Sequence, residues 1–172
     1  MQKFWPVPQS YSKRVPKNGK NGSFKRNDYY DKLKIWHTGI DLFCPNGSRV
    51  IAAEDCTVVR IWKFTGPPDA AQYRTTWAVN VRNGDGRIVV YGEVRRPKYM
   101  VGKRILAGRT VGRIAQVEHG RKQPLKGCRN MLHFELYRKG TKKTADWWHK
   151  GGKKPKGLLD PTGYLESCGR KK

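Results

Sequence analysis

Acidic residues are scarce in this chain of 172 residues. It carries 13 Asp and Glu against 37 Lys and Arg, which gives a formal net charge of +24. An excess of this size predicts attraction to a polyanion, with an affinity that falls as salt is added. Nucleic acid, acidic cell-wall polymers and an anionic membrane face all meet this requirement, so the charge alone does not identify the partner.

Long apolar stretches are also absent. No run approaches the roughly 18 consecutive apolar residues that indicate a transmembrane helix. The first residues lack the apolar core of a signal peptide. We therefore expect export by another route, such as lysis or a phage particle, or by a leader that precedes this sequence. Internal repeats at solenoid periods are missing as well.

The cysteines lack the spacing of a metal or redox motif. Cys44, Cys56, Cys128 and Cys168 contain no C-x-x-C pair, which argues against a thiolate zinc site and a thioredoxin-type motif. Four cysteines allow three complete disulfide pairings. Free buried thiols fit the sequence equally well, so the pairing stays open.

Aromatic residues, glycine and proline are plentiful. Six Trp, eight Tyr and five Phe can build a core, whereas 19 Gly and 10 Pro favour short strands joined by turns. Apolar-rich segments between turns predict strands at 41–43, 50–53, 57–62, 77–82 and 87–91, and alternation of apolar and polar residues predicts a strand at 131–137. A hairpin is predicted at Asn83-Gly84-Asp85-Gly86, and a tight turn within 101–114.

The predicted fold is mainly β, a single small antiparallel β domain over residues 35–172 with long basic loops at 116–130 and 138–157. Residues 1–34 are expected to form an irregular basic lead-in that packs on this domain. The second loop carries Trp147 and Trp148 among lysines. This pair either stacks on bases or sugars or anchors the loop to the sheet.

The segment Trp36-His37-Thr38-Gly39-Ile40-Asp41 places a histidine and a carboxylate four residues apart. In an extended segment the two side chains share a face and supply two ligands of a zinc site, which needs about three or four. Gly39 between them permits close approach of backbone or substrate. His133, on the polar face of the alternating strand 131–137, is the predicted third ligand. A buried His37–Asp41 hydrogen bond that stabilises a turn is the competing interpretation.

Several motifs follow one another over residues 35–137. They are His37-x-Gly39-x-Asp41, Gly47-Ser48-Arg49-Val50-Ile51-Ala52-Ala53, Tyr91-Gly92-Glu93, Val101-Gly102-x-x-x-x-Ala107-Gly108-x-x-x-Gly112 and Leu132-His133-Phe134-Glu135. This ordered set resembles the LytM/lysostaphin-type zinc metallopeptidases. The closing segment 160–165, Asp-Pro-Thr-Gly-Tyr-Leu, resembles the end of leukocyte cell-derived chemotaxin, an animal relative that keeps the zinc site without known peptidase activity.

The resemblance implies a β-sheet groove that holds one zinc ion through His37, Asp41 and His133. In active members of the family, water activated by the zinc attacks a peptide bond of bacterial peptidoglycan. The metal polarises the carbonyl and a nearby group handles the proton.

Two positions depart from the family's pattern. The family usually has His-x-His where this chain has Met131-Leu132-His133, and Tyr-x-His where it has Tyr91-Gly92-Glu93. Both departures remove imidazoles that assist catalysis, and neither removes a predicted ligand. Glu93 is the candidate replacement, as general base or electrostatic partner. Met131 can neither take up a proton nor donate a hydrogen bond, which favours a zinc site without activity.

Three further residues are assigned to the groove or to the support of the ligands. Tyr91 and Glu93 are predicted to share one face of their strand, and Met131 lies at the position of a lost histidine. Glu135 is on the face of His133, where it either orients that ligand by a hydrogen bond or is a solvated strand residue.

The two remaining histidines, His119 and His149, each lie in a basic loop. Either one could fold over the groove and substitute for a missing imidazole. A plain exposed histidine is the alternative for both.

The sequence favours a zinc-dependent endopeptidase that hydrolyses stem or cross-bridge peptide bonds of peptidoglycan. It would act at the bacterial cell wall, as an extracellular, periplasmic or phage-delivered protein, with its basic surface on the anionic wall. A catalytically inactive zinc-binding module of the same fold is one alternative. A basic nucleic-acid-associated structural protein is the other, and it is less favoured because no nucleic-acid-binding motif accompanies the charge.

Overall fold

The structure is a computed structural model, and it describes residues 2–12, 14–17, 19–67, 74–117, 130–144 and 147–169. In this part of the chain the elements are α1 (Asp28–Lys32), β1 (Ile35–Trp36), β2 (Ile40–Phe43), β3 (Arg49–Ile51), β4 (Cys56–Lys63), β5 (Trp77–Asn83), β6 (Ile88–Val94), β7 (Arg104–Ile105), β8 (Thr110–Arg113), β9 (Met131–Tyr137), β10 (Trp148–His149), β11 (Leu158–Leu159) and α2 (Thr162–Glu166). The fold is mainly β, as the sequence predicts.

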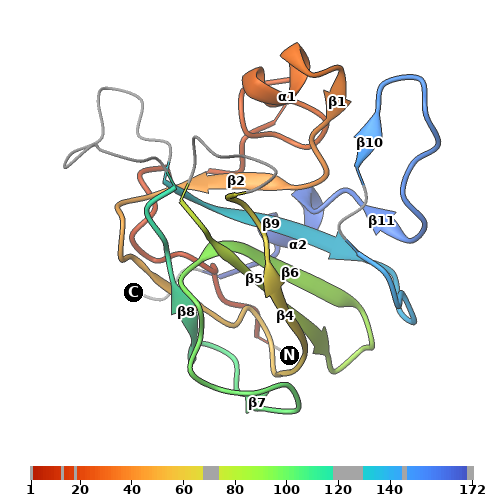
Figure 1. Cartoon of the computed structure of the whole chain (residues 1–172). Helices are drawn as coiled ribbons and strands as arrows, with labels where there is room; N and C mark the ends of the chain where they lie inside the picture. Colours follow the sequence, from red (N-terminus) through yellow and green to blue (C-terminus); the bar gives the residue numbers. More distant parts are fainter. Residues whose placement is uncertain are drawn as a thin grey trace.

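The main sheet is antiparallel and is organised around β9 (Figure 1). One side of β9 pairs with β6, and the sheet continues through β5 and β4 to β7 at its far edge. The other side of β9 pairs first with β2 and then with β11. Two small ribbons, β3 with β8 and β1 with β10, flank this sheet.

The predicted hairpin joins β5 to β6, and this prediction is confirmed. Gly86 in its turn has φ +86°, a conformation that glycine adopts without steric cost. The single tight turn predicted within 101–114 is wrong. The segment instead makes two turns, with Gly102 and Gly108 at positive φ, and the residues between and after them form β7 and β8.

Alternation along β9 divides the main sheet into two faces. Leu132, Phe134 and Leu136 belong to the larger core, which also takes in Trp5 and Val7 from the first residues of the chain. His133, Glu135 and Tyr137 alternate with them and point to the opposite face. There Tyr137 joins a second, smaller cluster that includes Trp148. The polar side chains of β9 thus leave the larger core and gather on one face.

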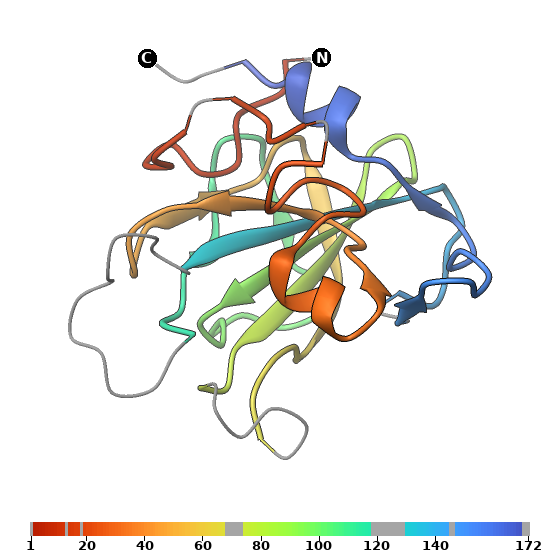
Figure 2. The same cartoon turned by 90° about the horizontal axis from the view of Figure 1, so that it is seen from above.

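The two ends of the described chain lie side by side (Figure 2). The backbone N–H of Trp5 donates to Gly169 O at 2.8 Å, and Gly169 N–H donates to Lys3 O at 2.8 Å. Further along, Gly22 O accepts from Asp41 N–H at 2.8 Å, which ties the N-terminal segment to β2. The segment before α1 therefore packs closely, although its described residues form no helix or strand.

Helix α2 supports β9 from the side of the larger core. The Tyr164 ring stacks on Phe134 with 5.7 Å between ring centroids, and its hydroxyl donates to Glu54 Oε2 at 2.7 Å. Asn83 Nδ2 donates to the same carboxylate oxygen at 2.6 Å. The closing residues of the chain thus satisfy a buried carboxylate and hold the strand that carries His133.

Two of the cysteines, Cys56 and Cys168, are buried free thiols. Burial raises the pKa of each to about 12, so both stay protonated at neutral pH. Cys44 is also buried, and Cys128 lies outside the described residues. Within the described ranges, no helix has the length and apolar character needed to cross a membrane.

Replacing Tyr164 by phenylalanine tests the support of β9. The ring would still stack on Phe134, but Glu54 would lose one buried hydrogen bond. We expect the free energy of unfolding to fall by about 1–2 kcal/mol in urea denaturation with a chelator present, so that metal does not contribute. An unchanged unfolding curve would contradict this role.

Candidate metal centre

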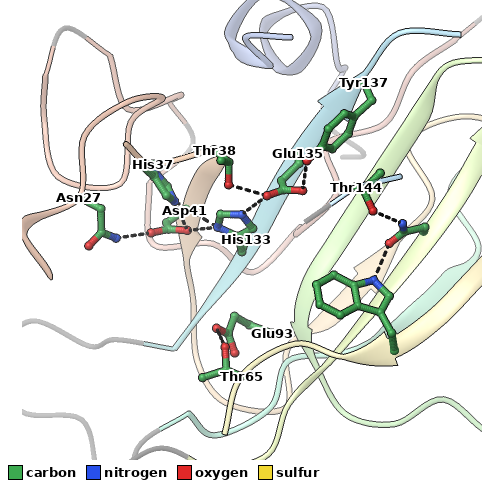
Figure 3. Close-up of polar contacts among 12 residues, drawn as sticks. Asn27, His37, Thr38, Asp41, Thr65, Glu93, His133, Glu135, Tyr137 and Thr144 are labelled. Atoms are coloured by element: carbon green, nitrogen blue, oxygen red, sulfur yellow. Dashed lines mark hydrogen bonds and ion pairs between the residues drawn. The ribbon is translucent and has the colours of Figure 1, made fainter. Parts of the chain in front are cut away.

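Three buried side chains from two strands and a connecting segment meet on one face of the main sheet (Figure 3). Asp41 on β2 lies directly opposite His133 on β9 in the strand register. His37 precedes β2, in the link from β1, and the chain bends at Gly39 before the strand begins. The segment 37–41 is therefore no continuous strand, yet His37 and Asp41 meet as the sequence predicts.

The atoms that face one another form a small triangle. His37 Nε2 lies 3.2 Å from Asp41 Oδ1 and 3.1 Å from His133 Nδ1, and His133 Nδ1 lies 3.0 Å from Asp41 Oδ1. Tetrahedral zinc with bonds of about 2.0–2.2 Å separates its ligand atoms by about 3.3–3.6 Å. Two imidazole nitrogens and one carboxylate oxygen at these separations fit a zinc ion after a small outward shift.

Each of the three side chains has its other polar atom held by a hydrogen bond. His37 Nδ1–H donates to the backbone carbonyl of Ser23 at 2.8 Å, and this tautomer leaves Nε2 as the ligating atom. Asp41 Oδ2 accepts from Asn27 Nδ2 at 2.9 Å, which leaves Oδ1 facing the histidines. Such outer hydrogen bonds fix the orientation of metal ligands.

Glu135 provides the corresponding bond for His133. His133 Nε2–H donates to Glu135 Oε1 at 3.0 Å, so Nδ1 is the atom turned toward His37 and Asp41. Thr38 Oγ1 donates to the same oxygen at 2.6 Å, and the Tyr137 hydroxyl donates to Oε2 at 3.0 Å. The carboxylate is buried and fully engaged, so it is no solvated strand residue.

The electrostatics of this cluster favour a bound cation. Burial would raise the pKa of Asp41, but His37 and His133 outweigh it and hold that pKa well below its usual range. Burial would likewise lower the pKa of His133, yet hydrogen bonds to Asp41 and Glu135 raise it to about 10. The pKa of Glu135 is lowered, because its bond to His133 outweighs burial. A metal-free site thus retains a proton, where a divalent cation could take its place.

Gly39 allows the ligands to approach. A Cβ at this position would lie 2.6 Å from the carbonyl oxygen of Phe134 and 2.8 Å from Cε1 and Nε2 of His133. These separations are shorter than real Cβ contacts, so any side chain here would displace the His133 ring or the β9 backbone. The close approach that the sequence predicts at Gly39 is made by the β9 backbone at Phe134 and by the His133 ring.

Glu93 lies beside this cluster because β6 contains a bulge. Trp77 pairs with Val94 and Val79 with Tyr91, so β6 has one more residue than β5 between these pairs. The bulged residue Glu93 has φ +61°, which is uncommon for a residue with a side chain. The extra residue breaks the alternation of the strand and turns Glu93 toward the face that carries His133 (Figure 3).

The Glu93 carboxylate is buried and only partly bonded. Thr65 Oγ1 donates to Oε1 at 2.8 Å, whereas Oε2 has no hydrogen-bond partner among the described residues. Burial raises the pKa of Glu93, and the hydroxyls of Thr76 and Thr65 and the charge of His133 offset this only in part. Glu93 makes no direct hydrogen bond to the three candidate ligands (Figure 3).

The structure corrects the predicted place of Tyr91. Its ring lies in the larger core, edge-on to Phe134, and its hydroxyl accepts from Ala53 N–H at 3.0 Å. Tyr91 and Glu93 do not share a face, because the bulge lies between Tyr91 and Val94 and includes Glu93. Met131 begins β9, half-buried and opposite Phe43, two residues before His133.

The other candidate residues lie elsewhere. His149 is exposed on β10, where it pairs with Ile35, and it does not belong to the His37–Asp41–His133 group. His119 lies outside the described residues. Trp148 is a buried anchor that packs on Phe24 and Trp36, whereas Trp147 is exposed.

The sequence pattern does not predict most of the residues that orient the candidate ligands through hydrogen bonds. Ser23 and Asn27 come from the basic N-terminal segment, where nothing in the sequence marks them as partners of His37 and Asp41. Thr38 and Tyr137 had a detectable signal, since Thr38 lies inside the histidine motif and Tyr137 shares the face of Glu135.

A mainly β sheet that presents two histidines and an aspartate at metal-binding separations is typical of one class of protein, the metallopeptidases built on an antiparallel sheet. The model of peptidase family M23 matches residues 36–145, more than half of the chain. The chain therefore belongs to peptidase family M23, and the resemblance to LytM/lysostaphin-type proteins is confirmed. None of the curated protein sequences matches significantly.

Solved structures share the fold. LytU is 16% identical with a TM-score of 0.56, covering 90% of this chain and 86% of its own. The lytM structure from Ruminococcus gnavus is 15% identical with a TM-score of 0.56, covering 97% of this chain and 60% of its own. Lysostaphin is 19% identical with a TM-score of 0.52, covering 80% of this chain. The present chain spans 46% of the lysostaphin chain, less than half of its length.

Substitution of Gly39 by alanine tests the close approach of β9. The new methyl group would push the His133 ring away from His37 and Asp41. We expect zinc affinity to fall at least about tenfold and the free energy of unfolding to drop by about 2 kcal/mol. Competition with a chelator and urea denaturation measure the two effects.

Gly163→Ala is the matched control. Gly163 lies in α2, and no atom lies within 4 Å of a Cβ at this position. This variant should bind zinc as the wild type does. Normal zinc binding by Gly39→Ala would show that the site tolerates the displacement.

Replacements of Glu135 test its hydrogen bond to His133. Glu135→Ala should lower zinc affinity by about 10–100-fold, because the ring loses the bond that orients it. Glu135→Gln keeps an acceptor oxygen and should lose less. Equal losses in the two variants, measured by chelator competition, would show that the charge rather than the hydrogen bond matters.

Proposed function

We propose that this chain is a zinc-dependent endopeptidase that cleaves stem or cross-bridge peptide bonds of peptidoglycan. The observation that carries this proposal is the triangle of His37 Nε2, Asp41 Oδ1 and His133 Nδ1, with sides of 3.0–3.2 Å and with every outward polar atom bonded. Membership of peptidase family M23 supports the reaction class.

His37, Asp41 and His133 would hold the zinc. When bound, zinc would polarise the substrate carbonyl and lower the pKa of a water molecule. Glu135 keeps the His133 ring in the tautomer that turns Nδ1 to the metal side, and Asn27 holds the Asp41 carboxylate. Phe64 packs against His133 with 5.2 Å between ring centroids, which screens the ligands from solvent.

Glu93 is the proposed general base. Among the described residues it is the carboxylate on this face that is neither a candidate ligand nor the partner of one, and its Oε2 has no hydrogen-bond partner there. Thr65 fixes Oε1, so the side chain is held while Oε2 stays available to accept a proton from the attacking water. Glu93 has φ +61°, and strained backbone conformations of this kind are concentrated at functional sites.

An inactive zinc-binding module is the second candidate. It is favoured by the absence of any further imidazole on this face among the described residues, since Met131 and Glu93 occupy the family's histidine positions and His149 is exposed elsewhere. Under this interpretation the protein would bind wall material or another polyanion without cutting it.

The proposed substrate also fits the charge of the chain. With a net charge of +24, the protein should adhere to anionic wall polymers, and its action would be at the cell wall. Nucleic acid remains the less favoured partner, because the charge is the only feature that points to it.

Turnover on defined peptidoglycan fragments tests the assignment of Glu93. Glu93→Gln should retain zinc, measured by elemental analysis, while kcat falls by about 10²–10⁴-fold because the proton acceptor is lost. Glu166→Gln is a suitable control, since this carboxylate is exposed on α2 and pairs with Lys17. Its activity should match that of the wild type.

Two results would contradict the proposal. Digestion of purified walls that is unaffected by chelation or by His133→Ala would exclude zinc chemistry. Zinc-loaded wild-type protein that releases no peptide, while still binding walls, would establish the inactive module.

A further inference from the structure

Exposed apolar side chains are concentrated at one place. Among the described residues six large hydrophobic side chains are exposed, and three of them lie within seven consecutive positions. Met100 is 78% exposed, Val101 58% and Leu106 50%. The other three are scattered along the chain. Single exposed apolar residues need no explanation, but a group of three does.

The three residues lie in the two turns that bracket β7. Lys103 N–H donates to Met100 O at 3.3 Å, and Arg109 N–H donates to Leu106 O at 3.0 Å. Gly102 and Gly108 adopt positive φ in these turns. Between them, Ile105 is buried in the larger core and fixes β7 to the sheet. The apolar tips therefore project from a firmly held edge.

The same segment is strongly basic. Residues 94–117 contain seven Lys and Arg and no Asp or Glu. Lys98, Lys103 and Arg109 are exposed beside the two turns. Of the ion pairs between described residues, only Arg104 with Asp55 involves this segment, at 3.9 Å and with both side chains well exposed. Among the described residues the positive charge of this segment is therefore almost entirely uncompensated.

Protection of a sheet edge explains only part of this. β7 is the edge strand of the main sheet, and natural edge strands often carry charges that prevent pairing with other chains. Exposed Met, Val and Leu at such an edge work against that protection. Edge protection therefore does not explain why Met100, Val101 and Leu106 are exposed.

We propose that this edge is a docking surface for an anionic lipid bilayer. Its residues, called here the β7 surface, are Lys98, Met100, Val101, Lys103, Leu106 and Arg109. Aliphatic tips can enter the headgroup and acyl boundary, while the surrounding cations contact anionic headgroups. Single-stranded nucleic acid would instead need aromatic side chains for base stacking. A soluble wall polymer would use the cations and leave the aliphatic tips without a role.

Docking at the β7 surface leaves the candidate metal centre open. The sheet order places β4, β5 and β6 between β7 and β9, which is four strand spacings or about 19 Å. β7 and the segment that carries α1, β1 and β2 lie at opposite ends of the molecule (Figure 1). A molecule bound to a bilayer would thus present the metal centre to material beyond the membrane.

Sedimentation of the full chain with vesicles tests the proposal. The probe vesicles contain equal parts of phosphatidylglycerol and phosphatidylcholine, and vesicles of phosphatidylcholine alone are the reference. The wild type should sediment with the anionic vesicles. Met100→Ser with Leu106→Ser should weaken this binding at least about tenfold, because apolar insertion is lost while the charge is unchanged.

Two further variants make the test specific. Lys98→Gln, Lys103→Gln and Arg109→Gln together should also weaken binding and reduce its dependence on salt. Leu33→Ser with Lys32→Gln removes one exposed apolar residue and one cation near α1, and it should bind as the wild type does. Circular dichroism and zinc content establish that each variant is folded.

Several outcomes would overturn the proposal. Unchanged vesicle binding by Met100→Ser with Leu106→Ser would mean that the protein adsorbs through its charge alone. Equal weakening by the Leu33 variant would show that no particular surface is used. Absence of wild-type binding to the anionic vesicles would likewise exclude a bilayer as the partner.

Discussion

The register between β2 and β9 is the constraint on which the candidate metal centre depends. Asp41 lies opposite His133 only in this pairing, and a slip of one residue would turn either side chain toward the larger core. The alternating Leu132, Phe134 and Leu136 prevent such a slip, because it would expose them all. Apolar packing on one face thus positions the polar ligands on the other.

Much of this arrangement could be predicted from the sequence. Alternation alone predicts β9, and spacing with chemistry identifies His37, Asp41 and His133 as possible ligands that the structure brings together. The direction of Glu93 could not be predicted, because a bulge depends on how β6 pairs with β5. The hydrogen bonds of Ser23 to His37 and of Asn27 to Asp41 could not be predicted either, because they depend on how an irregular segment packs.

Most of the buried carboxylates of this very basic protein lie at the candidate metal centre. Of 13 acidic residues, Asp41, Glu93 and Glu135 are buried at this one face. A buried carboxylate is costly unless it is paired, and here each has a partner or a nearby imidazole. Three of the four buried carboxylates among the described residues therefore lie at the candidate metal centre, and the fourth, Glu54, accepts a hydrogen bond from Tyr164.

The N-terminal segment has a consequence for how the centre is assembled. Ser23 and Asn27 contact His37 and Asp41, whereas Glu135 and Tyr137 complete the cluster from the other end of the chain. A ribosome would release the first group long before the last. The candidate metal centre can therefore be completed only after β9 has emerged, and a product that terminates before β9 would lack His133, Glu135 and Tyr137.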